Sequence, residues 1–357
     1  MACDLGLLPE AIRPRATELA NHIDFESMND KGAGGHVLIG FHKLLERDVV
    51  VKFYYWGGGD HAEPALLARF ESDFILKVHH AESINANDAF FITPYCANGD
   101  LDDALVSRKF GPLQSVDVLA QIAAGVSFLH GRGYLHRDLK PANIFCRPDG
   151  SFVIGDFGSV LVQNTDGYSI SITQHSLLYR PPEEIDEKNY YRQGDIYQLG
   201  IVLYQLLGGH LPYVERDWLS TKQQVIYDAL KGWDQRGFVD PIIKGKIRAG
   251  HILDMNKLPP WTPPALKTLI RGCTYVAREK RIATVADLTG RINNVRSKLP
   301  DWRIDEYPIL HRAKKQFRIV KGRQSFLIEK SVGGPWRTER AHNPATLDEA
   351  VRIAESL

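Results

Sequence analysis

The polar residues best placed to do chemistry in this chain lie in two short runs. The first reads His-Arg-Asp-Leu-Lys-Pro-Ala-Asn over residues 136–143, and the second reads Asp-Phe-Gly over residues 156–158. The segment between them is typical of a hairpin that turns at Pro148-Asp149-Gly150. Transfer of a phosphoryl group from ATP needs side chains of these types, acidic, amide and lysine, to position the reactants and balance their charge.

Taken together, the two runs are similar to the catalytic and metal motifs of the eukaryotic-type protein kinase superfamily. An isolated Asp-Phe-Gly arises by chance, but an eight-residue run followed by it at hairpin distance is specific. The resemblance implies an α+β, bilobal fold with a small β-rich lobe and a larger helical lobe. It also implies ATP and Mg²⁺ as cofactors and protein hydroxyl groups as phosphate acceptors.

The same resemblance implies roles for four residues of the two runs. Asp138 would accept or orient the proton of the substrate hydroxyl, and Lys140 would neutralise the transferring phosphoryl group. Asn143 and Asp156 match the two ligands of Mg²⁺, an ion that prefers hard oxygen donors.

A lysine at the end of a predicted strand resembles the one that binds the α- and β-phosphates in this family. The strand reads Val-Val-Val-Lys and ends at Lys52. The partner of this lysine should be an acid on the next helix, and the pattern of the following residues favours Glu63. Glu71 is the second candidate, and an exposed helical acid with no such role is the third reading.

A glycine-rich stretch precedes Lys52 and resembles the loop whose backbone amides cover the phosphates. Its candidate residues are Gly32, Gly34 and Gly35, and Val37 stands where the third glycine of the family pattern would be. If one residue is deleted relative to that pattern, the alignment shifts by one position. The register of the loop therefore stays open.

Five residues match the positions that enclose the adenine ring in the family. Thr93 fits the gatekeeper position, and the backbone of Pro94 and Cys96 fits the hinge that bonds the purine. Val50 and Phe145 fit the two side chains that lie above and below the ring. Each would be an ordinary core residue if the catalytic motifs were absent.

The substrate class follows from two further matches. Lys140, and Ser176 in the segment that ends in Pro-Pro-Glu, resemble the serine/threonine branch of the family.

Arg137 precedes the catalytic aspartate, and an arginine there usually pairs with a phosphate on the activation loop. The candidate phosphorylation sites, which could equally be ordinary loop hydroxyls, are Ser169, Ser171 and Thr173.

Two other matches are structural. Asp195 resembles the aspartate at a helix start that anchors the backbone of the catalytic loop. Glu183 should form a buried ion pair with Arg281, as the corresponding residues do in the family.

The chain divides by pattern into four parts: a lead-in helix over 1–23, a β-rich lobe over 24–95, a helical lobe over 96–298 and a small module over 302–357. The two lobes together form the expected kinase domain, 24–298. Apolar residues at helical spacing after Ser115, a candidate N-cap, predict one long helix of the second lobe. The last part has the pattern β-β-β-α, and its helix opens with the capping box Thr346-x-x-Glu349. Its strand-like runs are Phe317–Val320, Phe326–Lys330 and Trp336–Arg340.

A basic run lies at the start of this module. Six Lys or Arg residues and no acid occur between His311 and Arg323. Such a run is most often a solvated face, but it could dock a partner or substrate, or bind nucleic acid through Arg312, Lys314 and Lys315.

The overall composition limits the kinds of partner and the cellular compartment that we expect for the protein. The 357 residues carry 44 Lys and Arg against 43 Asp and Glu, so the net charge of +1 supplies no global attraction to nucleic acid or membranes. The four cysteines are scattered without zinc spacing, and no signal peptide or membrane span is predicted. We therefore expect a protein of the cytoplasm.

Two other classes of protein are alternatives to an active protein kinase. A pseudokinase or scaffold that binds nucleotide without turnover is favoured weakly by the altered glycine loop and the short helix after Lys52. The presence of Lys52, Asp138, Asn143 and Asp156 favours the enzyme. Small-molecule kinases rank third, because they usually lack the Pro-Pro-Glu segment and the Asp195 helix start.

Overall fold

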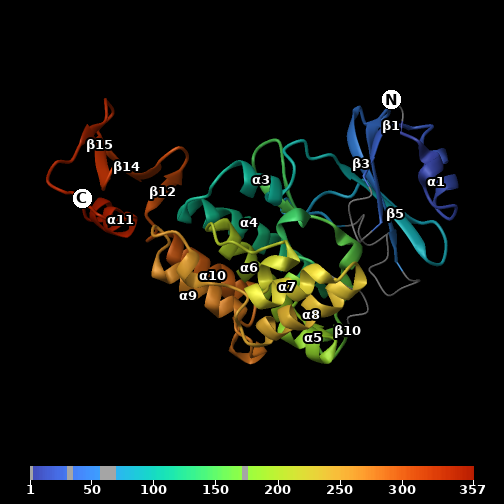
Figure 1. The fold of residues 1–357 in the computed structure, drawn as a ribbon. Helices are drawn as coiled ribbons and strands as arrows, with labels where there is room; N and C mark the ends of the chain where they lie inside the picture. Colours follow the sequence, from blue (N-terminus) through green and yellow to red (C-terminus); the bar gives the residue numbers. More distant parts are fainter. Residues whose placement is uncertain (1–2, 30–34, 57–69, 171–175) are drawn as a thin grey trace.

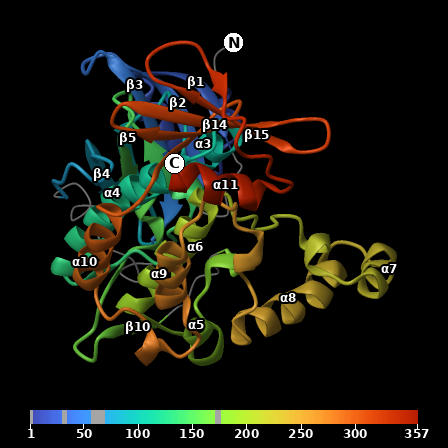
Figure 2. The same ribbon diagram turned by 90° about the vertical axis from the view of Figure 1, so that its left-hand side faces the viewer.

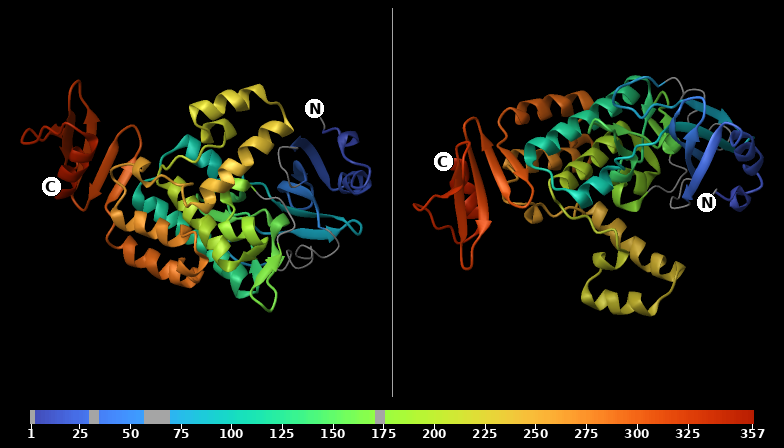
Figure 3. Two further views of the ribbon diagram at one scale, coloured as in Figure 1. Left: turned by 60° about the horizontal axis from the view of Figure 1, so that its bottom comes forward. Right: turned by 90° about the horizontal axis from the view of Figure 1, so that it is seen from above.

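The computed structural model describes residues 3–29, 35–56, 70–170 and 176–357. Figure 1 shows three parts in a row: a small β-rich lobe, a helical lobe and a C-terminal module at the far end. The views in Figure 3 show the same order from two other sides. The expected bilobal α+β arrangement with an additional C-terminal sheet is confirmed.

The small lobe is built on a five-stranded antiparallel sheet with strand order β1-β2-β3-β5-β4. The strands are β1 (Ile23–Asn29), β2 (His36–His42), β3 (Arg47–Tyr55), β4 (His80–Ser83) and β5 (Asp88–Pro94). Side chains alternate between the faces of a strand, so Lys52 points away from the face formed by Val49, Val51 and Phe53. β3 contains the predicted strand that carries Lys52, and it continues past this residue to Tyr55.

Helix α1 (Arg13–Leu19) covers the apolar face of this sheet. Its residue Ala16 and the preceding Ile12 share one buried cluster with Phe25 and Val49 of the strands. The segment predicted as a separate lead-in over 1–23 therefore contributes to the core of the small lobe, in the part that the structure describes.

The helical lobe is organised around two buried helices. Its main helices are α3 (Leu101–Ser107), α4 (Pro112–Gly131), α6 (Arg192–Leu206), α9 (Pro264–Thr274) and α10 (Val285–Arg296). Among the described helices, α4 alone has the length and apolar composition of a membrane span, but 56% of that window is buried inside the lobe. Because α4 packs against α6 and α10, its apolar character is that of a core helix.

The N-cap of α4 differs from the predicted one. Gly111 takes this position and Pro112 opens the helix, where a missing N–H costs nothing. Ser115 lies one turn inside, and its buried hydroxyl lies 2.8 Å from the carbonyl oxygen of Gly111 and 3.0 Å from that of Leu206. The serine was a misleading signal because its hydroxyl links two helices and caps neither N-terminus.

Three shorter or more exposed helices complete the lobe. They are α5 (Pro182–Glu187), α7 (Thr221–Ala229) and α8 (Trp233–Arg248). Figure 2 shows α7 and α8 projecting from the body of the lobe. Neither helix was predicted: α7 buries no side chain, and α8 contains Pro241, which argues against a helix although Val239, Ile243 and Ile247 recur at helical spacing.

The C-terminal module has five strands, and the prediction of three was incomplete. Their order along the sheet is β12 (Asp301–Ile304), β13 (Pro308–Arg312), β14 (Lys315–Lys321), β15 (Phe326–Ser331) and β16 (Arg337–Thr338). Helix α11 (Leu347–Ser356) packs on β14 and β15. The Thr346 hydroxyl accepts the N–H of Glu349 as predicted, but the Glu349 carboxylate accepts the N–H of Ala345 rather than that of Thr346.

The basic run does not form one patch. Lys314 and Lys315 lie at the turn between β13 and β14, whereas Lys321 and Arg323 lie at the opposite end of β14. Arg312 donates to the last-turn carbonyl of Glu355 in α11. Arg318 forms an ion pair with Glu329 of the neighbouring strand, with 2.6 Å between Nε and Oε2. The run is therefore divided between the two ends of β14, and docking or nucleic-acid binding through Arg312, Lys314 and Lys315 stays a prediction.

Candidate active site

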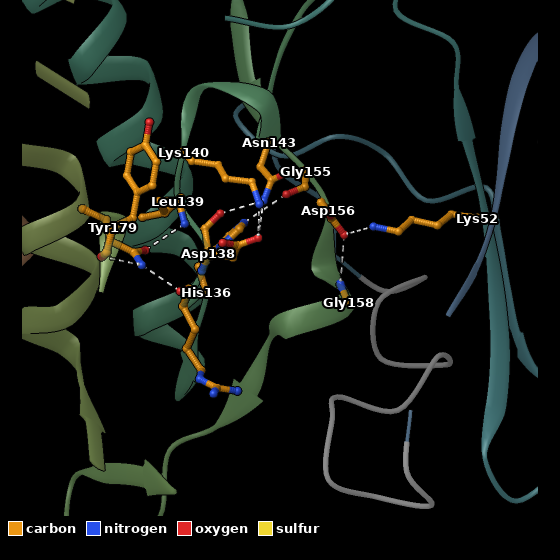
Figure 4. A network of polar contacts seen from close by, with 12 residues as sticks. Lys52, His136, Asp138, Leu139, Lys140, Asn143, Gly155, Asp156, Gly158 and Tyr179 are labelled. Carbon is orange, nitrogen blue, oxygen red and sulfur yellow. Dashed lines mark hydrogen bonds and ion pairs between the residues drawn. The ribbon is translucent and has the colours of Figure 1, made fainter. Parts of the chain in front are cut away.

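The catalytic run follows a short strand in the core of the helical lobe. β6 (Tyr134–Leu135) leads into it, and the hairpin of β7 (Ile144–Cys146) and β8 (Phe152–Ile154) follows. The predicted hairpin is confirmed, with Ile144 opposite Ile154 and the turn at residues 147–150. This hairpin brings the Asp-Phe-Gly run back beside the catalytic run (Figure 4).

Asp138 lies at the centre of a compact polar cluster. Its Oδ2 lies 2.8 Å from Nζ of Lys140 and accepts a hydrogen bond of 2.9 Å from Nδ2 of Asn143. The same Asn143 amide donates to the backbone carbonyl of Asp138 at 2.7 Å. Oδ1 of Asp138 is buried and has no hydrogen-bond partner among the described residues. One carboxylate oxygen is thus held in place and the other can accept a proton or a substrate hydroxyl.

Asp156 connects the two lobes. Its backbone is left-handed, with φ of 55°, and its carboxylate pairs with Nζ of Lys52 from β3. Figure 4 shows Lys52 reaching from the sheet toward this carboxylate. Burial would raise the pKa of Asp156, but the ammonium groups of Lys52 and Lys140 outweigh burial and hold it below its usual value. The carboxylate is therefore charged at neutral pH, as a metal ligand must be.

The predicted anchor of the catalytic loop is confirmed. Asp195 is fully buried at the start of α6, and its two oxygens accept the backbone N–H groups of His136 (3.0 Å) and Arg137 (2.8 Å). Tyr190 donates to it at 2.9 Å, and Nε2 of His130 lies 2.7 Å away. Burial would raise the pKa of Asp195, but the hydrogen bond and charge of His130 lower it overall.

A second residue of α6 also holds the catalytic loop, and the sequence analysis missed it. Gln198 accepts the N–H of Leu139 at 2.7 Å and donates to the carbonyl oxygens of Arg137 (2.7 Å) and Tyr179 (3.3 Å). Its position three residues after Asp195 was the available signal. Residues three apart share a helix face, and a glutamine in a buried apolar run needs polar partners.

The predicted ion pair beneath the site is confirmed as well. Arg281 binds the Glu183 carboxylate through two hydrogen bonds of 2.7 and 2.6 Å, and both side chains are buried. This bidentate pair joins α5 to the segment before α10, so its role is structural.

The candidate adenine residues lie on neighbouring strands. Val50 of β3 is opposite Thr93 of β5, which is buried, and Pro94 ends that strand. Cys96 follows and is buried, while Phe145 lies on β7 against Gly155. Pro94 and Cys96 lie where the chain passes from the last strand of the small lobe toward α3 of the helical lobe.

The structure settles where the glycine loop meets β2. Val37 lies in this strand directly opposite Lys52, so it does not hold a glycine position in the loop. Gly35, which precedes the strand, has φ of +122°, and a Cβ there would overlap the carbonyl oxygen of Phe53. Gly35 is therefore the last described loop residue that must be glycine, and it lies two positions before Val37, so a deletion of one position does not account for it. Gly32 and Gly34 lie outside the described residues.

Several other candidates are not brought to the site or cannot be placed. Glu63 lies outside the described residues, and Glu71 is exposed in irregular chain before Ile75. The described partner of Lys52 is Asp156, no ion pair with Glu71 is present among the described residues, and the choice of Glu63 stays a prediction.

The activation-loop candidates separate in the same way. Ser169 is buried in β10 (Tyr168–Ile170), and its hydroxyl donates to the carbonyl of Val162 at 2.6 Å, so it is not accessible to a kinase. Ser171 and Thr173 lie outside the described residues. Ser176 is half-buried, and in the described chain no hydrogen bond joins its hydroxyl to Asp138 or Lys140.

The donors at the site suit a cation that shares its coordination with a ligand. Among the described residues, no group of three or more His, Cys, Asp or Glu could enclose a metal ion. Mg²⁺ binds through one or two protein ligands plus water and phosphate oxygens, which fits the charged Asp156 carboxylate and the side-chain oxygen of Asn143.

Comparisons with known proteins agree with this geometry. The family model described as "Protein kinase domain" matches residues 31–289. A curated relative, "3-phosphoinositide-dependent protein kinase B" of Dictyostelium discoideum, is 29% identical over 300 residues. That alignment covers 74% of this chain but only 32% of the relative, so the chain spans about a third of that protein's length.

Proposed function

The chain belongs to the protein kinase superfamily, and we propose that it is an active, ATP- and Mg²⁺-dependent serine/threonine kinase. The observation that carries the proposal is the cluster of Lys52, Asp138, Lys140, Asn143 and Asp156 at the junction of the lobes. A scaffold that only holds nucleotide has no need of a buried carboxylate oxygen left without a partner.

Asp138 acts as the acceptor for the substrate hydroxyl through its free Oδ1. Lys140 and Asn143 hold the other oxygen, which fixes the carboxylate in one orientation. Lys140 also places positive charge beside the transferring group, where charge develops during transfer. Lys52 binds phosphate oxygens from the opposite lobe and orients the nucleotide toward Asp138.

Asn143 and Asp156 would hold the metal ion. When bound, Mg²⁺ neutralises phosphate oxygens and helps to align the γ-phosphate. The depressed pKa of Asp156 supports this role, because the carboxylate is charged at neutral pH without needing the metal.

The purine binds between Val50 and Phe145, with the backbone of Pro94 and Cys96 along one edge and Thr93 behind it. Three of them, Thr93, Pro94 and Val50, belong to paired strands that fix their spacing.

Serine and threonine are the preferred acceptors. Lys140 after the catalytic aspartate and Ser176 before the Pro-Pro-Glu segment support this branch, because tyrosine kinases carry alanine and arginine after the aspartate. We further propose autophosphorylation at Ser171 or Thr173. The phosphate group added there would pair with the buried Arg137, which precedes the catalytic aspartate. Ser169 is excluded from this proposal by its burial.

The test is to incubate the purified chain with labelled ATP, Mg²⁺ and a generic basic protein, and then to map the phosphorylated residues. We expect phosphoserine and phosphothreonine on the added protein and label on Ser171 or Thr173. A product that contains only phosphotyrosine would contradict the branch assignment. Tight ATP binding without label in either protein would favour the pseudokinase alternative.

A further inference from the structure

The C-terminal module meets the helical lobe at one unusually close backbone contact. A Cβ added at Gly111 would overlap the carbonyl oxygen of Trp302 in β12. Gly111 has an extended backbone with φ of −76°, which any residue can adopt. Glycine is needed here only because the module lies against it.

The lobe side of this contact is held firmly. The N–H of Gly111 donates to Oε1 of Gln114 at 3.1 Å, and its carbonyl accepts the hydroxyl of Ser115 at 2.8 Å. The Ser115 hydroxyl also contacts the carbonyl of Leu206 in α6 at 3.0 Å. A bulkier residue at position 111 would therefore displace the module rather than α4.

The module side is held by its own core. Trp302 is fully buried, and its Nε1 donates to the Glu355 carboxylate of α11 at 2.8 Å. Its ring also lies 6.4 Å from that of Trp261, which comes from the helical lobe just before α9. Trp302 thus belongs to the module core and to the junction at once.

A series of side-chain contacts leads from Phe110, the residue before Gly111, to the strand that carries Phe145 of the predicted adenine site. Phe110 is buried, with its ring 6.3 Å from that of Phe152 on β8. Phe152 is paired with Cys146 of β7, the strand that carries Phe145. Arg108 stacks over both Phe110 and Phe152, at 4.7 and 5.7 Å.

We propose that the C-terminal module positions the nucleotide site of the kinase through the Trp302–Gly111 contact. The docked module holds the corner at residues 108–111, and this corner supports the β7–β8 hairpin beneath the purine. Gly111 and Trp302 are positioning residues, since neither touches the reacting groups. The inference rests on the proposed function, because it requires that ATP bind against Phe145.

The experiment compares Gly111→Ala with Gly131→Ala in the full-length protein. The control glycine ends the same helix, and a Cβ there meets nothing within 4 Å. ATP affinity is measured by calorimetry, turnover by peptide phosphorylation, and the state of the junction by hydrogen exchange in β12. For Gly111→Ala we expect faster exchange in β12 and ATP affinity about tenfold weaker, a factor within the usual range of coupling between sites. The kcat at saturating ATP should stay within about twofold, and Gly131→Ala should match the wild type.

Each outcome has a defined meaning. Faster exchange in β12 with unchanged ATP affinity would overturn the inference, and so would unchanged exchange. A wild-type protein that binds no ATP would refute the proposed function itself, and the inference with it. Because Gly111→Ala could fail to fold, Trp261→Leu provides a second variant that weakens the junction from the lobe side. It should also weaken ATP binding while leaving the KM for the peptide unchanged, a split that general destabilisation would not produce.

Discussion

The catalytic loop and the C-terminal module are both held by the helical lobe, but by opposite means. Buried polar side chains of α6 hold the loop, because Asp195 and Gln198 accept hydrogen bonds from its backbone N–H groups. The module is held by an apolar core, the ring of Trp261 and the close approach of Trp302 to Gly111. The function of the catalytic loop should therefore depend on individual polar atoms. The attachment of the module should depend on how closely its surface fits that of the helical lobe.

The largest effect should come from the loop itself. Asp138→Ala removes the free carboxylate oxygen, and we expect phosphotransfer to fall by about 10³-fold, within the range for loss of a general base. ATP affinity and thermal stability should remain close to those of the wild type. The exposed Asp149→Ala, in the β7–β8 turn, is the matched control for loss of a carboxylate. Undiminished turnover in Asp138→Ala would show that another group accepts the proton.

Removal of the loop's anchor should affect stability as well as activity. Asp195→Ala would leave buried partners, including two backbone N–H groups of the loop, without their acceptor, so we expect a loss of about 3 to 5 kcal/mol in the free energy of unfolding. Urea denaturation measures this loss. Asp195→Asn keeps the shape and one acceptor oxygen, and it should cost less. Equal stability of the alanine variant and the wild type would contradict the idea that polar atoms hold the loop.

The stability of the C-terminal module should depend instead on how completely side chains fill its core. Trp302→Ala removes a fully buried side chain, and we expect a loss of about 3 kcal/mol in the stability of the module. Trp302→Phe keeps most of the packing and loses the bond to Glu355, so its cost should be smaller. Hydrogen exchange resolved along the chain would assign the loss to residues 301–357. A loss of protection that is equally large in the small lobe would contradict the idea that the packing of Trp302 stabilises the module in particular.

A smaller effect is expected from acid. The pKa of Asp195 is lower in the folded protein than in the unfolded chain, so the unfolded chain takes up its proton first as the pH falls. The stability contributed by this carboxylate is complete above its unfolded pKa, near about 4, and is lost as the pH falls through the folded value. Asp195→Asn should therefore narrow its stability gap to the wild type below about pH 4. A gap independent of pH would refute the lowered pKa.

The smallest effect should come from the surface of the module. Lys314→Ala with Lys315→Ala neutralises two exposed side chains at the β13–β14 turn, and we expect a stability change within about 0.5 kcal/mol. Phosphorylation of a short peptide should be unchanged, and so should ATP affinity. If the double variant loses peptide phosphorylation, the module takes part in catalysis through its charge rather than through its shape.

Local motifs predicted the parts of this protein that repeat a fixed pattern. The hairpin between the two catalytic runs follows from its turn residues, and the Asp195 anchor and the Glu183–Arg281 pair were implied by the family resemblance; the structure confirms all three. The strands β12 and β13 were missed because they are only four and five residues long, and the helix α7 was missed because none of its side chains is buried. Ser115 was misread because a serine near a helix start looks the same whether it caps that helix or bonds to a neighbouring one.

The sequence by itself determined the protein kinase family, the order of its catalytic groups and the existence of a module after the helical lobe, because these depend on residues close together in the chain. The tertiary structure decided which oxygen of Asp138 is free, that Ser169 is inaccessible, that Gly35 ends the glycine-rich loop and that the basic run is split between two turns. It also decided that Gly111 lies against Trp302, residues nearly 200 positions apart. Contacts between distant segments depend on how whole elements pack, and no local spacing encodes them.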